Sequence, residues 1–146
     1  MTITRRAVAL HLTAALFVTS SLAPLAAADR GALTVTVHYK GAGTVDANHR
    51  IWIWVFDTPD IGPNAMPVRE ESLAANGGSI AIEGLGEDRV WLAVGYDERG
   101  GSAGNAPPAP GSPIGIHGMG ANGPTPVTTA DAPTVVVTFD DTIRMP

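Results

Sequence analysis

The sequence contains no cysteine. A chain that folds outside the cell without disulfides has to be held together by an ordinary hydrophobic core. The same absence excludes a lipid anchor attached through a cysteine thioether. Beyond residue 28 no apolar run approaches the about 20 residues that a membrane span requires, and no repeat of fixed period occurs. The sequence therefore predicts neither a disulfide scaffold, nor a membrane-inserted chain, nor a repeat protein.

Basic residues are also scarce. Lys and Arg number 9 against 14 Asp and Glu, which gives a formal net charge of −5. Removal of residues 1–28 would take away Arg5 and Arg6 but no acidic residue, and would leave a formal charge of −7. A surface of this sign repels phosphate groups and anionic lipids. We therefore expect no nucleic-acid partner and no anionic membrane partner.

The N-terminal segment has the three parts of a secretory signal peptide. Arg5 and Arg6 give the positive start, Ala7–Leu22 is mostly apolar, and residues 26–28 form a small-residue cleavage site. The apolar run is short for a retained membrane anchor. We predict that residues 1–28 are removed and that the protein is secreted or periplasmic. Residues 29–146 then form one domain, because a chain of 118 residues is enough for one core and not for two.

Alternating apolar and polar residues predict several β-strands. Leu33–Lys40 alternates regularly, which is typical of a strand with one buried face. Arg50–Asp57, RIWIWVFD, is apolar on both faces, as in the central strand of a sheet. Val68–Ala75 fits a short edge strand or a single helical turn, and we favour the strand. Thr134–Asp140 is rich in β-branched residues and is expected to close the sheet.

The segment 75–100 contains two more alternating stretches, Ser79–Glu83 and Arg89–Tyr96, with Gly84 and Gly86 between them. Glycine reaches positive φ without a steric clash, so this link suits a turn. We therefore predict a β-hairpin here. The inward residues of its second strand are Val90, Leu92 and Val94.

A long loop follows this hairpin. Gly100–Pro126 holds 8 Gly and 6 Pro in 27 residues, with a short apolar island at Ile114 and Ile116. Loops of more than about 15 residues without structure of their own are rare in compact domains. The loop is therefore expected to be functional or disordered.

Together these segments give about seven short strands and no predicted helix. Turn signals separate the strands. This pattern predicts an all-β fold, namely a single antiparallel two-sheet β-sandwich over residues 29–146. A small closed barrel is the alternative.

The order of the motifs resembles a known group of folds. LTVTVHYKG, IWIWVF, NGGSIAIEGL, VWLAVGYDERGG and PIGIHG follow one another between Leu33 and Phe139. This order is similar to the transthyretin-like or carboxypeptidase-regulatory-like β-sandwich, and especially to bacterial secreted proteins in which a strand ending in Tyr or His, followed by Asp, opens a loop. The resemblance implies that Arg50–Asp57 and Arg89–Tyr96 are neighbouring strands.

If these strands are neighbours, the inward aliphatic residues force Trp52, Trp54 and Trp91 onto the opposite face of the sheet. Flat rings on a sheet surface can stack against a sugar ring or another apolar ligand. Exposed Trp is also common in protein interfaces. Alternatively, the loop Gly100–Pro126 folds back over the rings and forms a second small core. The three Trp residues are our candidate ligand-binding residues.

Members of such families often have a loop suited to calcium after the Asp, and Asp97 fits its first position. Here Arg99, Gly100 and Gly101 stand where oxygen ligands would be needed, and calcium requires about six to eight of them. We interpret Asp97 as a turn-forming residue and expect no metal and no cofactor. The relatives that hydrolyse hydroxyisourate carry paired His and Arg motifs and a terminal Tyr-Arg-Gly-Ser. This chain ends in IRMP, so that activity is not expected.

The sequence contains one match to a catalytic motif. Residues 100–104, GGSAG, match the G-x-S-x-G pattern of hydrolases and follow a strand. The nucleophile of that pattern requires a helix directly after the serine, which Asn105–Pro108 cannot begin. We therefore predict a non-catalytic binding or structural accessory module with a protein or glycan partner. The alternatives are a glycan-binding module and a small hydrolase that uses Ser102 with His117.

Overall fold

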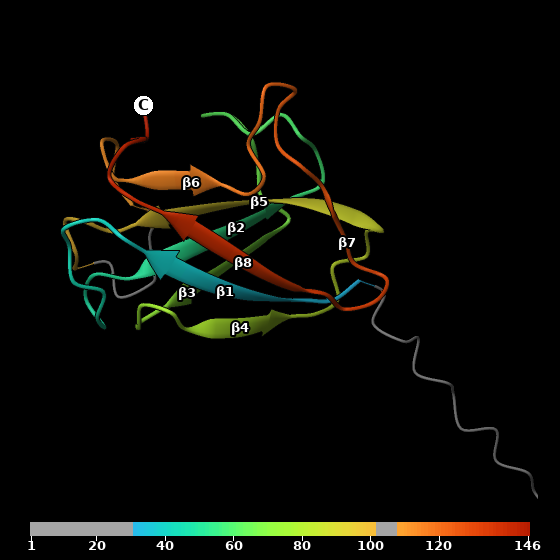
Figure 1. Ribbon diagram of the computed structural model, residues 1–146, viewed down its shortest axis with the longest axis horizontal. Helices are drawn as coiled ribbons and strands as arrows, with labels where there is room; N and C mark the ends of the chain where they lie inside the picture. The colour runs from blue at the N-terminus through green and yellow to red at the C-terminus, as the bar shows by residue number, and fades with distance from the viewer. Residues whose placement is uncertain (1–30, 102–107) are drawn as a thin grey trace, which may run out of the picture.

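The computed structural model describes residues 31–101 and 108–146 (Figure 1). Within these residues the chain forms eight β-strands and no helix. In chain order they are β1 (Leu33–Tyr39), β2 (Ile51–Phe56), β3 (Arg69–Leu73), β4 (Ser79–Ile82), β5 (Arg89–Tyr96), β6 (Ile114–Ile116), β7 (Val127–Thr128) and β8 (Thr134–Phe139). In this part of the chain no helix is long and apolar enough to cross a membrane. The predicted signal peptide lies outside the described residues and stays a prediction.

The strands form two sheets. One sheet has three strands in the order β4-β1-β8, and the other has the order β3-β2-β5-β6, with β7 paired to the start of β5. Figure 1 shows β1 and β8 crossing in front of the five-stranded sheet. The prediction of an all-β fold with two sheets is confirmed. The strand estimate missed the two-residue β7, because so short a segment carries no periodic pattern.

The main core lies between the sheets and is built by alternation along the strands. The inward residues of β1, β5 and β8 are buried, as the period-two pattern predicted. All six residues of β2 are buried, which confirms its central position between β3 and β5. β3 is an edge strand, also as predicted.

The predicted hairpin of β4 and β5 is wrong. β4 pairs with β1 in one sheet, and β5 pairs with β2 in the other. The link between them crosses from sheet to sheet with Leu85 buried in the core, and the Leu85 N–H donates to the Gly31 carbonyl at 3.0 Å. Gly84 and Gly86 have positive φ, as a turn requires, but the buried leucine between them directs the chain across the sandwich.

The expectation of purely antiparallel pairing is also wrong, because β1 and β8 are parallel. β7 pairs with the start of β5, and the segment after β7 leads to the end of the three-stranded sheet where β1 begins. β8 therefore starts beside the start of β1 and runs in the same direction. Buried Thr129 holds this crossover. Its carbonyl accepts from the Ala32 N–H at 3.3 Å, and its own N–H donates to the Asp88 carbonyl at 3.0 Å.

Candidate functional site

The three tryptophans lie on the outer face of the five-stranded sheet. The β2–β5 register places Trp52 opposite Gly95, Trp54 opposite Ala93 and Phe56 opposite Trp91. The alternate residues of β2, Ile53 and Val55, belong to the main core. A Cβ atom on Gly95 would lie 2.7 Å from the Trp54 ring, so only glycine leaves room for this ring beside β5. The predicted neighbouring strands and the predicted shared face are therefore both correct.

Of the two alternatives that the sequence left open for these rings, exposed or covered, the structure shows Trp52 and Trp54 covered. The exposed fraction is 4% for Trp52 and 8% for Trp54, and Trp91 is half-buried. The rings of Trp52 and Trp54 stack with centroids 6.4 Å apart and planes inclined by 20°. With Phe56 and Ala93, Trp52 and Trp54 form a second hydrophobic core on the outside of the sheet, against which Trp91 packs.

Four partly buried aliphatic side chains cover this second core. Ile61 and Ala65 come from the segment after β2, Ile116 comes from β6, and Met145 comes from the C-terminal segment. Of these, only Ile116 belongs to the loop 100–126 that was expected to provide an alternative cover. Residues 102–107 of that loop lie outside the described part of the chain.

The two sides of this cover are attached differently. Met145 is held by backbone pairing, because its N–H donates to the Ser112 carbonyl at 2.9 Å and its carbonyl accepts from the Gly111 N–H at 3.0 Å. The segment with Ile61 and Ala65 is bonded locally instead. The Ile61 N–H donates to the Pro59 carbonyl and the Ala65 N–H to the Gly62 carbonyl. The Ile61–Ala65 side is therefore the side with less backbone attachment to the sheet.

Two polar atoms of the second core are left without partners. The indole N–H groups of Trp52 and Trp91 are buried, and neither has a hydrogen-bond acceptor within residues 31–101 and 108–146. A buried donor without an acceptor costs about 1 to 3 kcal/mol. Indole N–H groups usually find an acceptor when they are buried. The sequence predicted the face but gave no sign of this deficit, which depends on how the rings pack.

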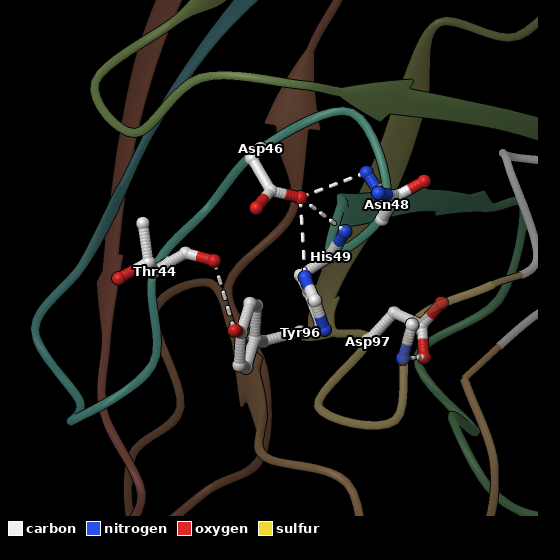
Figure 2. Close-up of polar contacts among 7 residues, drawn as sticks. Thr44, Asp46, Asn48, His49, Tyr96 and Asp97 are labelled. Atoms are coloured by element: carbon white, nitrogen blue, oxygen red, sulfur yellow. Dashed lines mark hydrogen bonds and ion pairs between the residues drawn. The ribbon is translucent and has the colours of Figure 1, made fainter.

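The end of the sandwich at the start of β2 carries a network of polar contacts (Figure 2). Asp46 Oδ1 accepts from the backbone N–H groups of Asn48 and His49, both at 2.8 Å, and lies 3.1 Å from His49 Nδ1. The His49 N–H is the main cause, and the Asn48 N–H the second, of a lowered Asp46 pKa. The hydroxyl of Tyr96 donates to the Thr44 carbonyl at 3.0 Å. These contacts fix the turn between β1 and β2.

Asp97 acts as the predicted turn former. Its carboxylate is buried and accepts from the Gly100 N–H at 3.0 Å, immediately after β5 ends. Figure 2 shows this contact beside the Asp46 turn. No group of three or more His, Asp or Glu side chains that could hold a metal ion occurs among the described residues.

Of the two residues of the hydrolase alternative, only His117 belongs to the part of the chain that the structure describes. Ser102 lies outside the described residues. His117 follows β6, and its N–H donates to the Leu92 carbonyl in the middle of β5. The loop begins after the C-terminal end of β5, where the Gly101 N–H donates to the Asn48 carbonyl at 3.1 Å.

A groove of about 320 Å³ lies where the edge strands β6 and β8 face each other. Its walls are mainly apolar, and Lys40 and Asp140 are its charged lining residues. Sequence reasoning missed this groove because its lining comes from β6, β8 and the segments that follow them. The lining residues are Lys40, Ile114, Gly115, Ile116, Met119, Thr138, Phe139, Asp140, Thr142 and Ile143.

Comparison of the chain with models of protein families, with curated proteins and with solved structures gave no match.

Proposed function

We propose that this chain is an exported, non-catalytic binding module of transthyretin-like type that contacts its ligand through the aromatic face formed by Trp52, Trp54 and Trp91. The observation that carries the proposal is the pair of buried indole N–H groups, on Trp52 and Trp91, that have no acceptor in the described residues. A ligand oxygen that reaches these donors restores the hydrogen bonds that burial removed.

The chemistry of the face indicates the ligand class. Indole rings offer flat apolar surfaces, and their N–H groups need oxygen acceptors. A sugar ring presents an apolar C–H face beside hydroxyl oxygens, so it matches both requirements. A glycan is therefore the ligand that the face fits best.

Binding requires access to rings that are covered in the unliganded chain. Trp91 is half-buried, whereas Trp52 and Trp54 are buried, so it is the point of entry. Ile61 and Ala65 are the part of the cover to be displaced, because their segment is bonded mainly to itself. Met145 stays in place, since its backbone pairs with residues 111 and 112.

Ring-preserving substitutions test this function. Trp52→Phe and Trp91→Phe each keep an aromatic ring and remove one of the unpaired donors. We expect each to weaken glycan binding about tenfold, which corresponds to about 1.4 kcal/mol. Binding is measured by glycan array and by titration of tryptophan fluorescence. Trp54→Phe is the matched control, because it removes an indole of the same face but leaves both unpaired donors.

The result that would overturn the proposal is specific. If Trp52→Phe and Trp91→Phe remain folded by circular dichroism and bind glycans as the unchanged protein does, the two donors take no part in recognition. An unchanged protein that binds no glycan on the array also contradicts the proposed ligand class.

A further inference from the structure

The open edges of the two sheets differ in how they are protected. Exposed edge strands pair with other chains unless they are short, charged or covered. β3 is charged, with Arg69, Glu70 and Glu71 among its five residues, and β4 has only four residues. β6 has three residues, and the Ile114 N–H is bonded to the Ile143 carbonyl of the C-terminal segment. These three edges are therefore poor partners for another strand.

β8 lacks all of these protections. Its six residues, TVVVTF, include no charge, no proline and no glycine, and no strand of the described chain pairs with its outer edge. The Thr34 N–H donates to the Pro133 carbonyl and the Lys40 N–H to the Phe139 carbonyl, so the odd-numbered residues bond to β1. In a parallel ladder the alternate residues turn their N–H and C=O groups to the other side. The free groups of β8 therefore belong to Thr134, Val136 and Thr138.

The sequence of β8 is complementary to itself. Residues 134–138 read Thr-Val-Val-Val-Thr in both directions. In an antiparallel pair of two β8 strands with Val136 on the two-fold axis, Val136 faces the partner's Val136 and Thr134 faces the partner's Thr138. This register places the residues whose backbone groups are free opposite one another. The Val136–Val136 pair and the two Thr134–Thr138 pairs are therefore hydrogen-bonded, and the Val135–Val137 pairs between them are the non-hydrogen-bonded pairs of an antiparallel ladder.

The side chains also suit this register. Pairs of β-branched residues and pairs of threonine hydroxyls are favourable across strands. The same sheet already contains such a contact, because the hydroxyls of Thr36 and Ser79 lie 2.7 Å apart between β1 and β4. No charged residue lies within the paired segment, so the register brings no like charges into opposition there.

The groove between β6 and β8 extends the same surface. In this register Phe139 faces the partner's Pro133, so the partner's chain passes the mouth of the groove. Met119 and Ile143 line the groove with exposed fractions of 53% and 57%, and Val136 is 57% exposed. These are three of the five large hydrophobic side chains that are exposed in the described residues. One contact would shield all three from water.

We propose that two copies of this chain associate through their β8 edges, in the antiparallel register with Val136 on the axis, and join their three-stranded sheets into one. The paired β8 strands lie in the other sheet from the aromatic face, although Ile116 of the adjoining groove also packs against the second core. The inference does not depend on the proposed function.

Charge and size set the strength of this association. Asp141 would lie opposite the partner's Asp131, and both copies carry a negative net charge, so repulsion opposes association and salt should relieve it. A single short strand pair is a small interface. We therefore expect a dissociation constant of about 10 µM to 1 mM.

Sedimentation velocity on the full chain, from about 10 µM to about 1 mM, tests the association. We expect the mean mass to rise towards that of a dimer as the protein concentration increases. When sodium chloride is added, this rise should occur at a lower protein concentration. Val136→Lys places two like charges on the axis and should weaken association at least about tenfold. Ala81→Lys is the matched control, because Ala81 is exposed on β4 at the far edge of the same sheet. It should leave the association unchanged.

A second experiment tests the register. Because the chain has no cysteine, Val136→Cys introduces a single thiol. Residues in a hydrogen-bonded antiparallel pair have Cα atoms about 5.5 Å apart, a spacing that a disulfide can bridge. Thiols that are held close together react faster than thiols that meet by diffusion. Mild oxidation should therefore link Val136→Cys into dimers at least about tenfold faster than Ala81→Cys. A mass that stays monomeric throughout, or equal rates of linking for the two variants, overturns the proposal.

Discussion

The hydroxyl of Tyr39 donates a hydrogen bond to the carboxylate of Asp141, which ties the end of β1 to the turn after β8. The ring of Tyr39 also stacks on Tyr96 of the opposite sheet, with centroids 4.4 Å apart. Asp141 accepts a second hydrogen bond, from the Ala42 N–H at 2.9 Å. One tyrosine thus links three segments that are distant in sequence, and it closes the core at this end of the sandwich.

A double-mutant cycle measures this link. Tyr39→Phe keeps the stacked ring and removes the donor, while Asp141→Asn removes the charge of the acceptor. We expect Tyr39→Phe to lower the free energy of unfolding by about 1 to 2 kcal/mol. The coupling between the two changes should be about 1 kcal/mol. Urea denaturation of the two single variants and the double variant gives these values, and strictly additive effects would contradict the link.

Stability should fall at both extremes of pH. The Tyr39 hydroxyl is the main cause, and the Ala42 N–H the second, of an Asp141 pKa below its ordinary value. A carboxyl whose pKa is lowered by folding contributes stability above its ordinary pKa and loses it as pH falls through the folded pKa. Burial, followed by the hydrogen bond to Asp141, raises the pKa of Tyr39. That contribution is fully present below about pH 10 and is lost as pH rises further.

The midpoint of thermal unfolding, measured between about pH 2 and pH 11, reports the loss of stability at low pH and at high pH. Asp141→Asn should flatten the loss of stability below about pH 4. Asp131→Asn removes the same charge from an exposed position and should leave that acid limb unchanged. Identical acid limbs in the two variants would show that the Tyr39–Asp141 contact does not set the acid limit.

The sequence was sufficient to predict the strands and their buried faces, because period-two alternation reports directly which side chains face the core. It was not sufficient to predict how strands pair. Gly84 and Gly86 permit a tight hairpin and a crossover equally, and the burial of Leu85 decides between them. The parallel pairing of β1 with β8 depends likewise on the route of residues 129–133, where no periodic pattern exists.

The candidate site was predictable in part. The shared face of Trp52, Trp54 and Trp91 follows from alternation along two neighbouring strands. Its cover does not, because Ile61 and Met145 reach it from segments that lie outside both strands. The turn at Asp97 was predictable, since an Asp side chain commonly accepts a hydrogen bond from a backbone N–H a few residues further along the chain.

Gly115 controls how closely β6 approaches β8 beside the groove. A Cβ atom at this position would lie 2.5 Å from Phe139 Cβ and 3.3 Å from Val94 Cγ2, so Gly115→Ala has to push the two sheets apart. Overpacking of this kind typically costs about 1 to 3 kcal/mol. Gly120→Ala is the matched control, since nothing lies within 4 Å of its Cβ position, and it should change stability by less than about 0.5 kcal/mol. Stability is measured by urea denaturation. Equal midpoints for the two variants would mean that β6 and β8 can move apart without loss of stability, and that the close contact of β6 with Phe139 contributes nothing to stability.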